Sequence, residues 1–538
     1  MVIALSTRRV WDGLAVVALI AVAVVSVLTF RDYGLGWDDY THAEYGDLLL
    51  TLLASGFADR RALSFVNLYA YGGGFDMLAA LAAKVSPFDL FETRRLCGAI
   101  LGLIGLAATW RIGRRLGGPL AGALALALLA ADPLYFGHMF FNPKDAPFAI
   151  AMTILLLGLV RAFEEYPAPS AATVTIFSIG LGLAIGTRVI GALAALYALA
   201  AILLIVGAEA RKMGARAAGR DAAAFVLALW PGLILAYAVL ALVWPWAVVS
   251  PLNPLKALVY FSHFFEKPWK EMFAGVAVPV LAMPRAYVPQ LLALKTPEIL
   301  LLLGIAGIAG VGVAVLRRRA PVRWRAALLV LALAATLPVV LTVAMRPAMY
   351  NGLRHFVFVT PPMAVLGALA GAWIIAGAAR AWRGAGALAA IAVAIGLAVP
   401  VVEMIRLHPY EYTHFNWIAG GVRAADERYM LDYWGLAFKQ ASQELRAQLT
   451  ERLETPSRRR WQIAVCGPHR PAQVELGPEF AISWNPKGAD FAMTLGEFYC
   501  AELPAPVLVE IAREGVVYAR VYDIRGRAIT SLLTLPAP

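Results

Sequence analysis

The chain is poor in charged residues. Of its 538 residues only 15% are Asp, Glu, Lys or Arg, whereas 61% are hydrophobic, and the mean hydropathy is +0.70. Soluble domains carry about 25% charged residues, so this composition excludes a soluble globular protein. The apolar residues fall in stretches of about 20, separated by short basic or Gly/Pro-rich segments, which is typical of a polytopic membrane protein.

The sequence also lacks the short motifs of several protein classes. It has no P-loop, no Gly-x-Ser-x-Gly segment and no dinucleotide fingerprint. It has no zinc-binding spacing and no internal repeat like those of many transporters. Its 47 Lys and Arg exceed its 35 Asp and Glu. Because the arginines lie between apolar stretches, the excess indicates membrane topology and not nucleic-acid binding.

Cysteine is scarce, with three residues in the chain. Cys97 lies in an apolar stretch, where we expect it to be inert packing. Cys466 and Cys500 lie in the polar C-terminal part, and they could form a disulfide if that part is outside the cytoplasm. The sequence leaves their state open.

Eleven apolar stretches are predicted to span the membrane. They are residues 11–30, 95–111, 118–135, 146–163, 172–188, 190–208, 222–244, 298–316, 326–345, 356–378 and 385–402. The first follows Arg8 and Arg9 without a small-residue cleavage site after it, so we expect an uncleaved anchor. Arginine clusters follow every even-numbered stretch. The positive-inside rule therefore places the N-terminus in the cytoplasm and the C-terminus outside.

Residues 66–84 are apolar enough to suggest a further span. Counting them would reverse the parity and move every later arginine cluster outside. They also contain three consecutive glycines and Asp76, which fit a spanning helix poorly. We therefore predict an in-plane or re-entrant helix at the interface.

The predicted fold is a polytopic α-helical membrane protein of about eleven spans over residues 1–403. It has in-plane juxtamembrane helices in a first outer loop, 31–94, and a large outer loop, 245–297. Residues 404–538 are more polar and are predicted to form a small soluble α/β domain. Residues 436–454 have helical periodicity, and 461–466, 490–495 and 516–524 have the pattern of short strands.

Asp38 and Asp39 directly follow the first span, with His42 close behind. Two acids beside a bilayer must be hydrated or paired with cations. They could cap a helix that begins near Tyr40, although one acid would suffice for a cap. A carboxylate in a partly desolvated cleft is also a good general base.

Three further polar clusters fall on the same predicted outer face. Asn142-Pro-Lys144-Asp145 enters a span, and Asp145 could cap that helix or meet the first acids to bind a metal or orient a sugar hydroxyl. Arg188 lies outside against the charge bias, so it either snorkels or contacts a phosphate. Arg354-His355, at another span entrance, could anchor the helix or clamp an anionic head group.

These segments resemble the GT-C superfamily of membrane glycosyltransferases, in particular the family-39-like branch with protein O-mannosyltransferases and lipid A aminoarabinose transferases. Its acidic pair is matched by Trp37-Asp38-Asp39-Tyr40, and its second acid by Asp145. The stretches 350–358, 408–412 and 431–435 look like segments of bacterial members. The resemblance covers about 30–440. Two features depart from the family pattern. Many members have Glu at the position of Asp39, and the C-terminal domain is not the β-trefoil insertion of the eukaryotic mannosyltransferases.

The resemblance implies inverting transfer of a hexosyl or pentosyl group from a polyprenyl-phosphate donor to a hydroxyl acceptor at the outer face of a bacterial inner membrane. Asp38 would be the general base, with Asp39 and Asp145 positioning acceptor or sugar. The residues that would bind donor phosphate and sugar are Lys144, Arg188, Arg354, His355, Asn142 and His42. A divalent cation is not required, but Mg²⁺ or Mn²⁺ would suit Asp38, Asp39 and Asp145.

Two other functions compete with this one. A transporter or flippase for a lipid-linked or anionic solute would place its charges at mid-membrane on broken helices, whereas these charges lie at span ends. A non-catalytic scaffold leaves the gathering of acids and bases on one face unexplained. The sequence identifies neither the sugar nor the acceptor, which could be a glycolipid, a polysaccharide or a protein.

Overall fold

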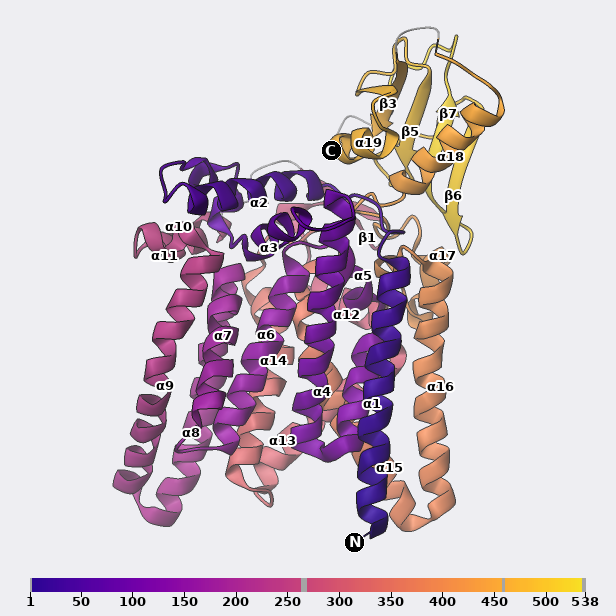
Figure 1. Ribbon diagram of the computed structural model, residues 1–538. Helices are drawn as coiled ribbons and strands as arrows, with labels where there is room; N and C mark the ends of the chain where they lie inside the picture. Colours follow the sequence, from indigo (N-terminus) through magenta and orange to yellow (C-terminus); the bar gives the residue numbers. More distant parts are fainter. Residues whose placement is uncertain (1, 263–268, 457–459, 535–538) are drawn as a thin grey trace.

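The computed structural model describes residues 2–262, 269–456 and 460–534. Long helices run side by side in a bundle, and a sheet domain stands on one end of it (Figure 1). We call this the domain end; the N-terminus lies at the opposite end (Figure 1). The bundle helices are α1 (Val2–Thr29), α4 (Leu90–Ala130), α5 (Pro133–Phe141), α6 (Asp145–Glu164), α7 (Ala171–Thr187), α8 (Ala194–Met213), α9 (Ala215–Val243), α13 (Glu298–Arg317), α14 (Val322–Met345), α15 (Thr360–Ala381) and α16 (Arg383–Leu407).

Within the described residues, nine helices are long and apolar enough to cross a membrane. Two differences separate this number from the eleven predicted stretches. The stretches 95–111 and 118–135 share α4, which has non-helical backbone at Gly118 (φ 81°); the second stretch ends in α5, after Asp132. The stretch 172–188 corresponds to α7, whose 17 residues fall short of a full span.

Short helices cover the domain end. Helices α2 (Asp39–Ala54) and α3 (Gly74–Ala83) lie across it, as do α10 (Pro245–Val249) and α11 (Asn253–Ser262) (Figure 1). Ten residues of α3 make about 15 Å of helix, half the thickness of a bilayer core. Helix α3 is therefore too short to span a bilayer, in agreement with the prediction that residues 66–84 are not a further span.

A buried ion cluster fastens α2 and α3 to α4. The Asp76 carboxylate accepts a hydrogen bond from Arg94 at 2.6 Å and lies 2.6 Å from Nδ1 of His42. All three side chains are at most 2% exposed. Removing one member of such a group would leave an unpaired buried charge, so the in-plane helices are held in one place.

The C-terminal domain is a five-stranded sheet in the order β4-β3-β5-β7-β6. Strand β3 (Trp461–Cys466) pairs in parallel with β4 (Phe480–Ser483) and β5 (Phe491–Leu495), whereas β7 (Val516–Asp523) is antiparallel to β5 and β6 (Val507–Arg513). The helices are α18 (Phe438–Glu451) and α19 (His469–Leu476). The predicted strands correspond to β3, β5 and β7. The sequence reading missed β4, only four residues long, and the edge strand β6.

Cys466 and Cys500 form a disulfide that closes a loop of sequence separation 34. It ties the end of β3 to the segment after β5. This settles the state of the two cysteines that the sequence left open. Disulfides persist in oxidising compartments.

The remaining elements join the bundle to the domain and the loops to the bundle. They are η1 (Arg61–Ser64), η2 (Leu68–Ala70), η3 (Val189–Leu193), β1 (Lys270–Phe273), β2 (Val276–Pro279), η4 (Val280–Ala282), α12 (Tyr287–Lys295), η5 (Arg354–Val359), η6 (Glu411–Thr413), η7 (Trp417–Ala419) and α17 (Gly421–Ala425).

Candidate active site

Asp38 lies just before α2, and its carboxylate makes no capping hydrogen bond. Instead, Oδ2 is 3.2 Å from Nζ of Lys144 and 3.6 Å from Nη1 of Arg354. Burial opposes ionisation, but the charges of Lys144 and Arg354 outweigh it and hold the pKa of Asp38 below its usual value. The side chain is 32% exposed. Asp38 is thus an ionised carboxylate that a ligand can reach.

Asp145 begins α6 and is held by the turn before it. The side-chain amide of Asn142 donates through Nδ2 to Asp145 at 2.9 Å, and its Oδ1 accepts from the backbone N–H groups of Lys144 and Asp145. The other Asp145 oxygen forms an ion pair with Arg188, the residue that directly follows α7. The turn therefore presents Lys144 to Asp38 while its next residue pairs with Arg188.

Arg354 connects the two carboxylates. It interacts electrostatically with both Asp145 and Asp38, and its guanidinium lies 5.0 Å from the ring centre of Tyr350 and 4.9 Å from that of Trp434. Aromatic faces favour a cation at this range. The ring of His355 lies 5.0 Å from that of Tyr350. Arg354 is thus fixed by its surroundings and not only by the acids.

Tyr71 supports the other two cations. Its ring centre lies 5.1 Å from Nζ of Lys144 and 5.6 Å from the Arg188 guanidinium. Lys144, Arg188 and Arg354 supply three positive charges against the two carboxylates, Asp38 and Asp145. We call these five residues the charge cluster; its surplus positive charge favours an anionic ligand.

Two predicted site residues are used elsewhere. Asp39 is 1% exposed and accepts hydrogen bonds from Arg95 at 2.7 and 2.9 Å and from the Gly36 N–H at 2.8 Å. His42 pairs with Asp76, although its Nε2 has no hydrogen-bond partner among the described residues. Both side chains hold the first loop in place.

The three carboxylates proposed as metal ligands do not fit that role. Asp39 is occupied by Arg95, Asp38 by Lys144 and Asp145 by Arg188. Across the described part of the chain, no group of three or more His, Cys, Asp or Glu side chains is placed to hold a metal ion. We therefore derive no step through a metal ion.

Glu271, in β1, is a site residue that sequence reasoning missed. Its carboxylate is 2% exposed and accepts hydrogen bonds from the backbone N–H groups of Asn351 and Gly352 and from the Tyr287 hydroxyl at 2.5 Å. Burial raises the pKa of Glu271. It braces the turn that leads into Arg354. No motif surrounds it in the large 245–297 loop, so no sequence signal could have identified it.

The segment after the last span closes over the first loop. The Trp37 N–H donates to the Trp434 carbonyl at 3.3 Å, and the Trp434 ring lies so close to Gly36 that any Cβ there would collide with it. Asp432 holds this segment by accepting from the N–H groups of residues 435, 436 and 437. The Trp434 ring that packs against Arg354 therefore comes from a segment about 80 residues later in the chain.

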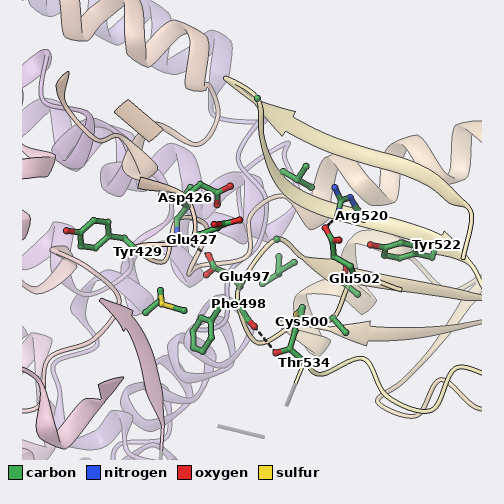
Figure 2. Close-up of a pocket in the computed structure, with 18 residues that line it drawn as sticks. Asp426, Glu427, Tyr429, Glu497, Phe498, Cys500, Glu502, Arg520, Tyr522 and Thr534 are labelled. Carbon is green, nitrogen blue, oxygen red and sulfur yellow. Dashed lines mark hydrogen bonds and ion pairs between the residues drawn. The ribbon is translucent and has the colours of Figure 1, made fainter. Parts of the chain in front are cut away.

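A separate cavity of about 460 Å³ lies between the linker 426–431 and the C-terminal domain. Asp426, Glu427, Glu497 and Phe498 surround it (Figure 2). Met272 lines this cavity, whereas its neighbour Glu271 bonds to the turn before Arg354. None of the five residues of the charge cluster lines it.

Comparisons with known proteins address the family. Residues 74–246 match the family model described as dolichyl-phosphate-mannose-protein mannosyltransferase. No curated protein matches the chain. Among solved structures, it is similar to ArnT from Cupriavidus metallidurans in the apo state, with a TM-score of 0.50 and 16% identity over 94% of this chain and 97% of that one.

Two further solved structures are similar. ArnT from Cupriavidus metallidurans bound to undecaprenyl phosphate has a TM-score of 0.48 and 16% identity, covering 95% of this chain and 98% of that one. The archaeal oligosaccharyltransferase AglB from Archaeoglobus fulgidus, in complex with an inhibitory peptide and a dolichol-phosphate, has 0.48 and 13%, covering 90% and 69%. The matched family segment and the fold shared with apo ArnT confirm the resemblance drawn from the sequence, and the chain has the fold of the GT-C superfamily of membrane glycosyltransferases.

Proposed function

We propose that the chain is an inverting glycosyltransferase that moves a sugar from a polyprenyl-phosphate donor to a hydroxyl acceptor. One observation carries the proposal: the reachable carboxylate of Asp38 is held between Lys144 and Arg354, in a cluster with surplus positive charge. A base beside an anion-binding group is what displacement of a phosphate by a hydroxyl requires.

In the proposed step, Asp38 takes the proton of the acceptor hydroxyl as its oxygen attacks the anomeric carbon. The bond from that carbon to the phosphate oxygen breaks, and the polyprenyl phosphate leaves with the bonding electrons. Lys144, Arg188 and Arg354 stabilise the negative charge that grows on the phosphate. Asp145 keeps Arg188 in place, and Asn142 keeps Asp145 in place.

Donor binding would also change the basicity of Asp38. Without a ligand, Lys144 and Arg354 lower the pKa of this carboxyl, which makes it a weak base. A donor phosphate would share both cations and so relieve this effect. Asp38 would then become a stronger base only when the donor is in place, which would discourage futile proton transfer.

Several observations support the proposed donor class and location. The matched family is named for a dolichyl-phosphate-linked mannose donor, and ArnT has been solved with undecaprenyl phosphate. A lipid phosphate lies at the membrane surface, the level of the loops that carry Asp38 and Asp145. The arginine parity and the Cys466–Cys500 disulfide support an extracytoplasmic position for this face. We place the protein in a bacterial inner membrane, among membrane lipids, with its N-terminus inside.

The test is transfer by the purified protein in lipid nanodiscs, supplied with labelled polyprenyl-phosphate hexoses and pentoses and an extract of envelope glycolipids and polysaccharides. We expect release of polyprenyl phosphate together with a labelled acceptor. The competing transporter function would instead move labelled donor between leaflets of vesicles without cleaving it. Movement with no cleavage, for every donor, would overturn the proposal.

A further inference from the structure

Two cavities share one flank of the bundle, and neither is lined by a residue of the charge cluster. One, of about 410 Å³, lies between α13 and α16; the other, of about 570 Å³, lies at the end of α16 where it meets the C-terminal domain. Trp417 lines both. They therefore adjoin at Trp417, and we treat them as one feature with a mainly apolar part and a polar part.

The apolar part is a groove on two membrane-spanning helices. Ile299 of α13, Gly396 and Val399 of α16 and Ile418 line it. Glu298 also lines it, and its carboxylate accepts a hydrogen bond from the Trp417 backbone N–H at 2.6 Å. A Cβ on Gly396 would lie 2.9 Å from Ile299, so glycine lets the helices approach closely. Trp417 and Ile418 are 72% and 63% exposed, as expected for side chains that face lipid at the interface. An acyl chain fits such a groove.

The polar part carries charges of both signs. Arg406 and Arg423 are exposed and have no ion-pair partner within the part of the chain that the structure describes, and two carboxylates, Glu403 and Glu514, share the cavity with them. Glu514 lies in the turn between β6 and β7. The tip of this hairpin comes down to α17, above α16 (Figure 1).

His414 adds a buried imidazole ring that has one nitrogen without a partner among the described residues. It is 2% exposed and lines the polar cavity. Its Nδ1 lies 3.4 Å from Glu403, but its Nε2 has no hydrogen-bond partner among the described residues. Buried polar atoms nearly always have a partner, so Nε2 of His414 is an unused hydrogen-bonding group in the lining of this cavity.

We propose that this feature binds a phospholipid whose head group combines a phosphate with a primary ammonium, as in phosphatidylethanolamine. Arg406 and Arg423 hold the phosphate, Glu403 and Glu514 take the ammonium, His414 completes the polar contacts, and an acyl chain fills the groove. A purely anionic head group would leave the two carboxylates facing negative charge. A quaternary ammonium has no N–H to donate to them.

Such a lipid would join the C-terminal domain to α16, because its head group touches the β6–β7 turn and the end of the span together. The site does not rest on the proposed transfer reaction, since it shares no residue with the charge cluster. Loss of the lipid would leave the chemistry of that cluster in place.

Native mass spectrometry of the full-length protein tests the proposal, by titration with dioleoyl phosphatidylethanolamine, phosphatidylcholine and phosphatidylglycerol. We expect phosphatidylethanolamine to bind about tenfold more tightly than the others, since one charged hydrogen bond is worth that much or more. R406Q/R423Q should weaken binding of all three lipids, because each of them carries the phosphate that the two arginines hold. The matched control is R380Q/R383Q. These two exposed arginines lie where α15 ends and α16 begins, at the end of α16 away from the proposed site.

Two further variants separate the parts of the site. Val399→Trp should weaken binding of all three lipids by filling the groove. Glu403→Gln, which keeps an acceptor for the Trp417 indole N–H, should remove only the preference for the primary ammonium. Three results would overturn the proposal: equal or tighter binding of phosphatidylglycerol, equal effects of the control and test arginine pairs, or full displacement of the lipid by soluble glycerophosphoethanolamine, which would indicate a water-soluble ligand.

Discussion

Lys144 joins Asp38 across more than a hundred residues of chain, with its Nζ 3.2 Å from Oδ2 of the carboxylate. The pair connects the first loop, which follows α1, to the turn that begins α6. Nη1 of Arg354 lies 3.6 Å from the same Asp38 oxygen. A phosphate that approaches Lys144 and Arg354 must therefore compete with Asp38 for them. Donor binding and the state of the base are therefore coupled in the proposed reaction.

Asp38→Asn is expected to reduce kcat of sugar transfer by at least about 100-fold, because general-base catalysis typically contributes 10²–10⁴. The fold should be unaffected, since the side chain is partly exposed and makes no capping bond. Asp47→Asn, at an exposed acid of α2, is the control and should transfer normally. Normal turnover by the Asp38 variant would remove it from the base role.

Lys144→Gln is expected to move the acid limb of the pH profile of kcat/KM to higher pH. Lys144 and Arg354 lower the pKa of Asp38 against its burial, so the carboxylate stays ionised well below 3.8, and losing one cation raises its pKa. By linkage, the pair stabilises the fold above 3.8 and loses this effect as the pH falls through the lowered pKa.

The measurement for this variant is transfer in nanodiscs from about pH 3 upward, into the ordinary range for carboxyl groups. Lys84→Gln, at the end of α3, is the control. Lys144 is also proposed to contact the phosphate, so KM should rise as well. A change in KM alone, however, does not shift the pH at which kcat/KM falls on the acid side. A limb that stays in place would show that this ion pair does not set the pKa of the base.

Asp39→Asn should destabilise the protein by about 3–5 kcal/mol, because it leaves Arg95 as a buried charge without its counter-ion. Thermal unfolding in detergent measures this effect. The double variant D39L/R95M, which removes both charges, should recover much of the loss. If Asp39→Asn abolished transfer while unfolding like the wild type, the acid would have a direct role in the reaction and not the structural one assigned above.

The contrast between Asp38 and Asp39 shows where sequence reasoning stopped. Apolar length was enough to predict most of the spans, and the resemblance drew attention to the acidic pair. Adjacent residues at a helix start point about 100° apart, so one acid reaches the cluster and the other turns inward to Arg95. The sequence cannot say which, because both partners, Lys144 and Arg95, lie far along the chain.

Glu271 shows the same limit for a whole element. It acts through backbone N–H groups of residues 351 and 352, so neither end of the contact has a sequence signature. The state of Cys466 and Cys500 likewise depended on strand pairing, because β3 had to lie beside β5 before the thiols could meet. Long-range pairing of this kind becomes visible only in the fold.

Glu271→Ala is expected to lower kcat/KM about tenfold by loosening the turn before Arg354, since it removes the acceptor of two backbone N–H groups. As Glu271 is a positioning residue, Glu271→Gln, which keeps an acceptor, should restore most of the activity. Lys270→Ala, an exposed neighbour on β1, is the control. An equal loss in the Ala and Gln variants would mean that the charge, and not the bracing of the turn, matters.

Reporter fusions should place the charge cluster outside the cytoplasm. A fusion after Gly117, beside the arginines at the break in α4, should report the cytoplasm, whereas fusions after Ser86 and within the C-terminal domain should report the outside. The disulfide gives an independent readout: alkylation of unreduced, denatured protein should leave Cys466 and Cys500 unlabelled and modify Cys97. An outside signal after Gly117 would reverse the parity. It would put Asp38 and Asp145 in the cytoplasm, where a disulfide in the same domain end would not persist, so the two readouts must agree for the proposed location to stand.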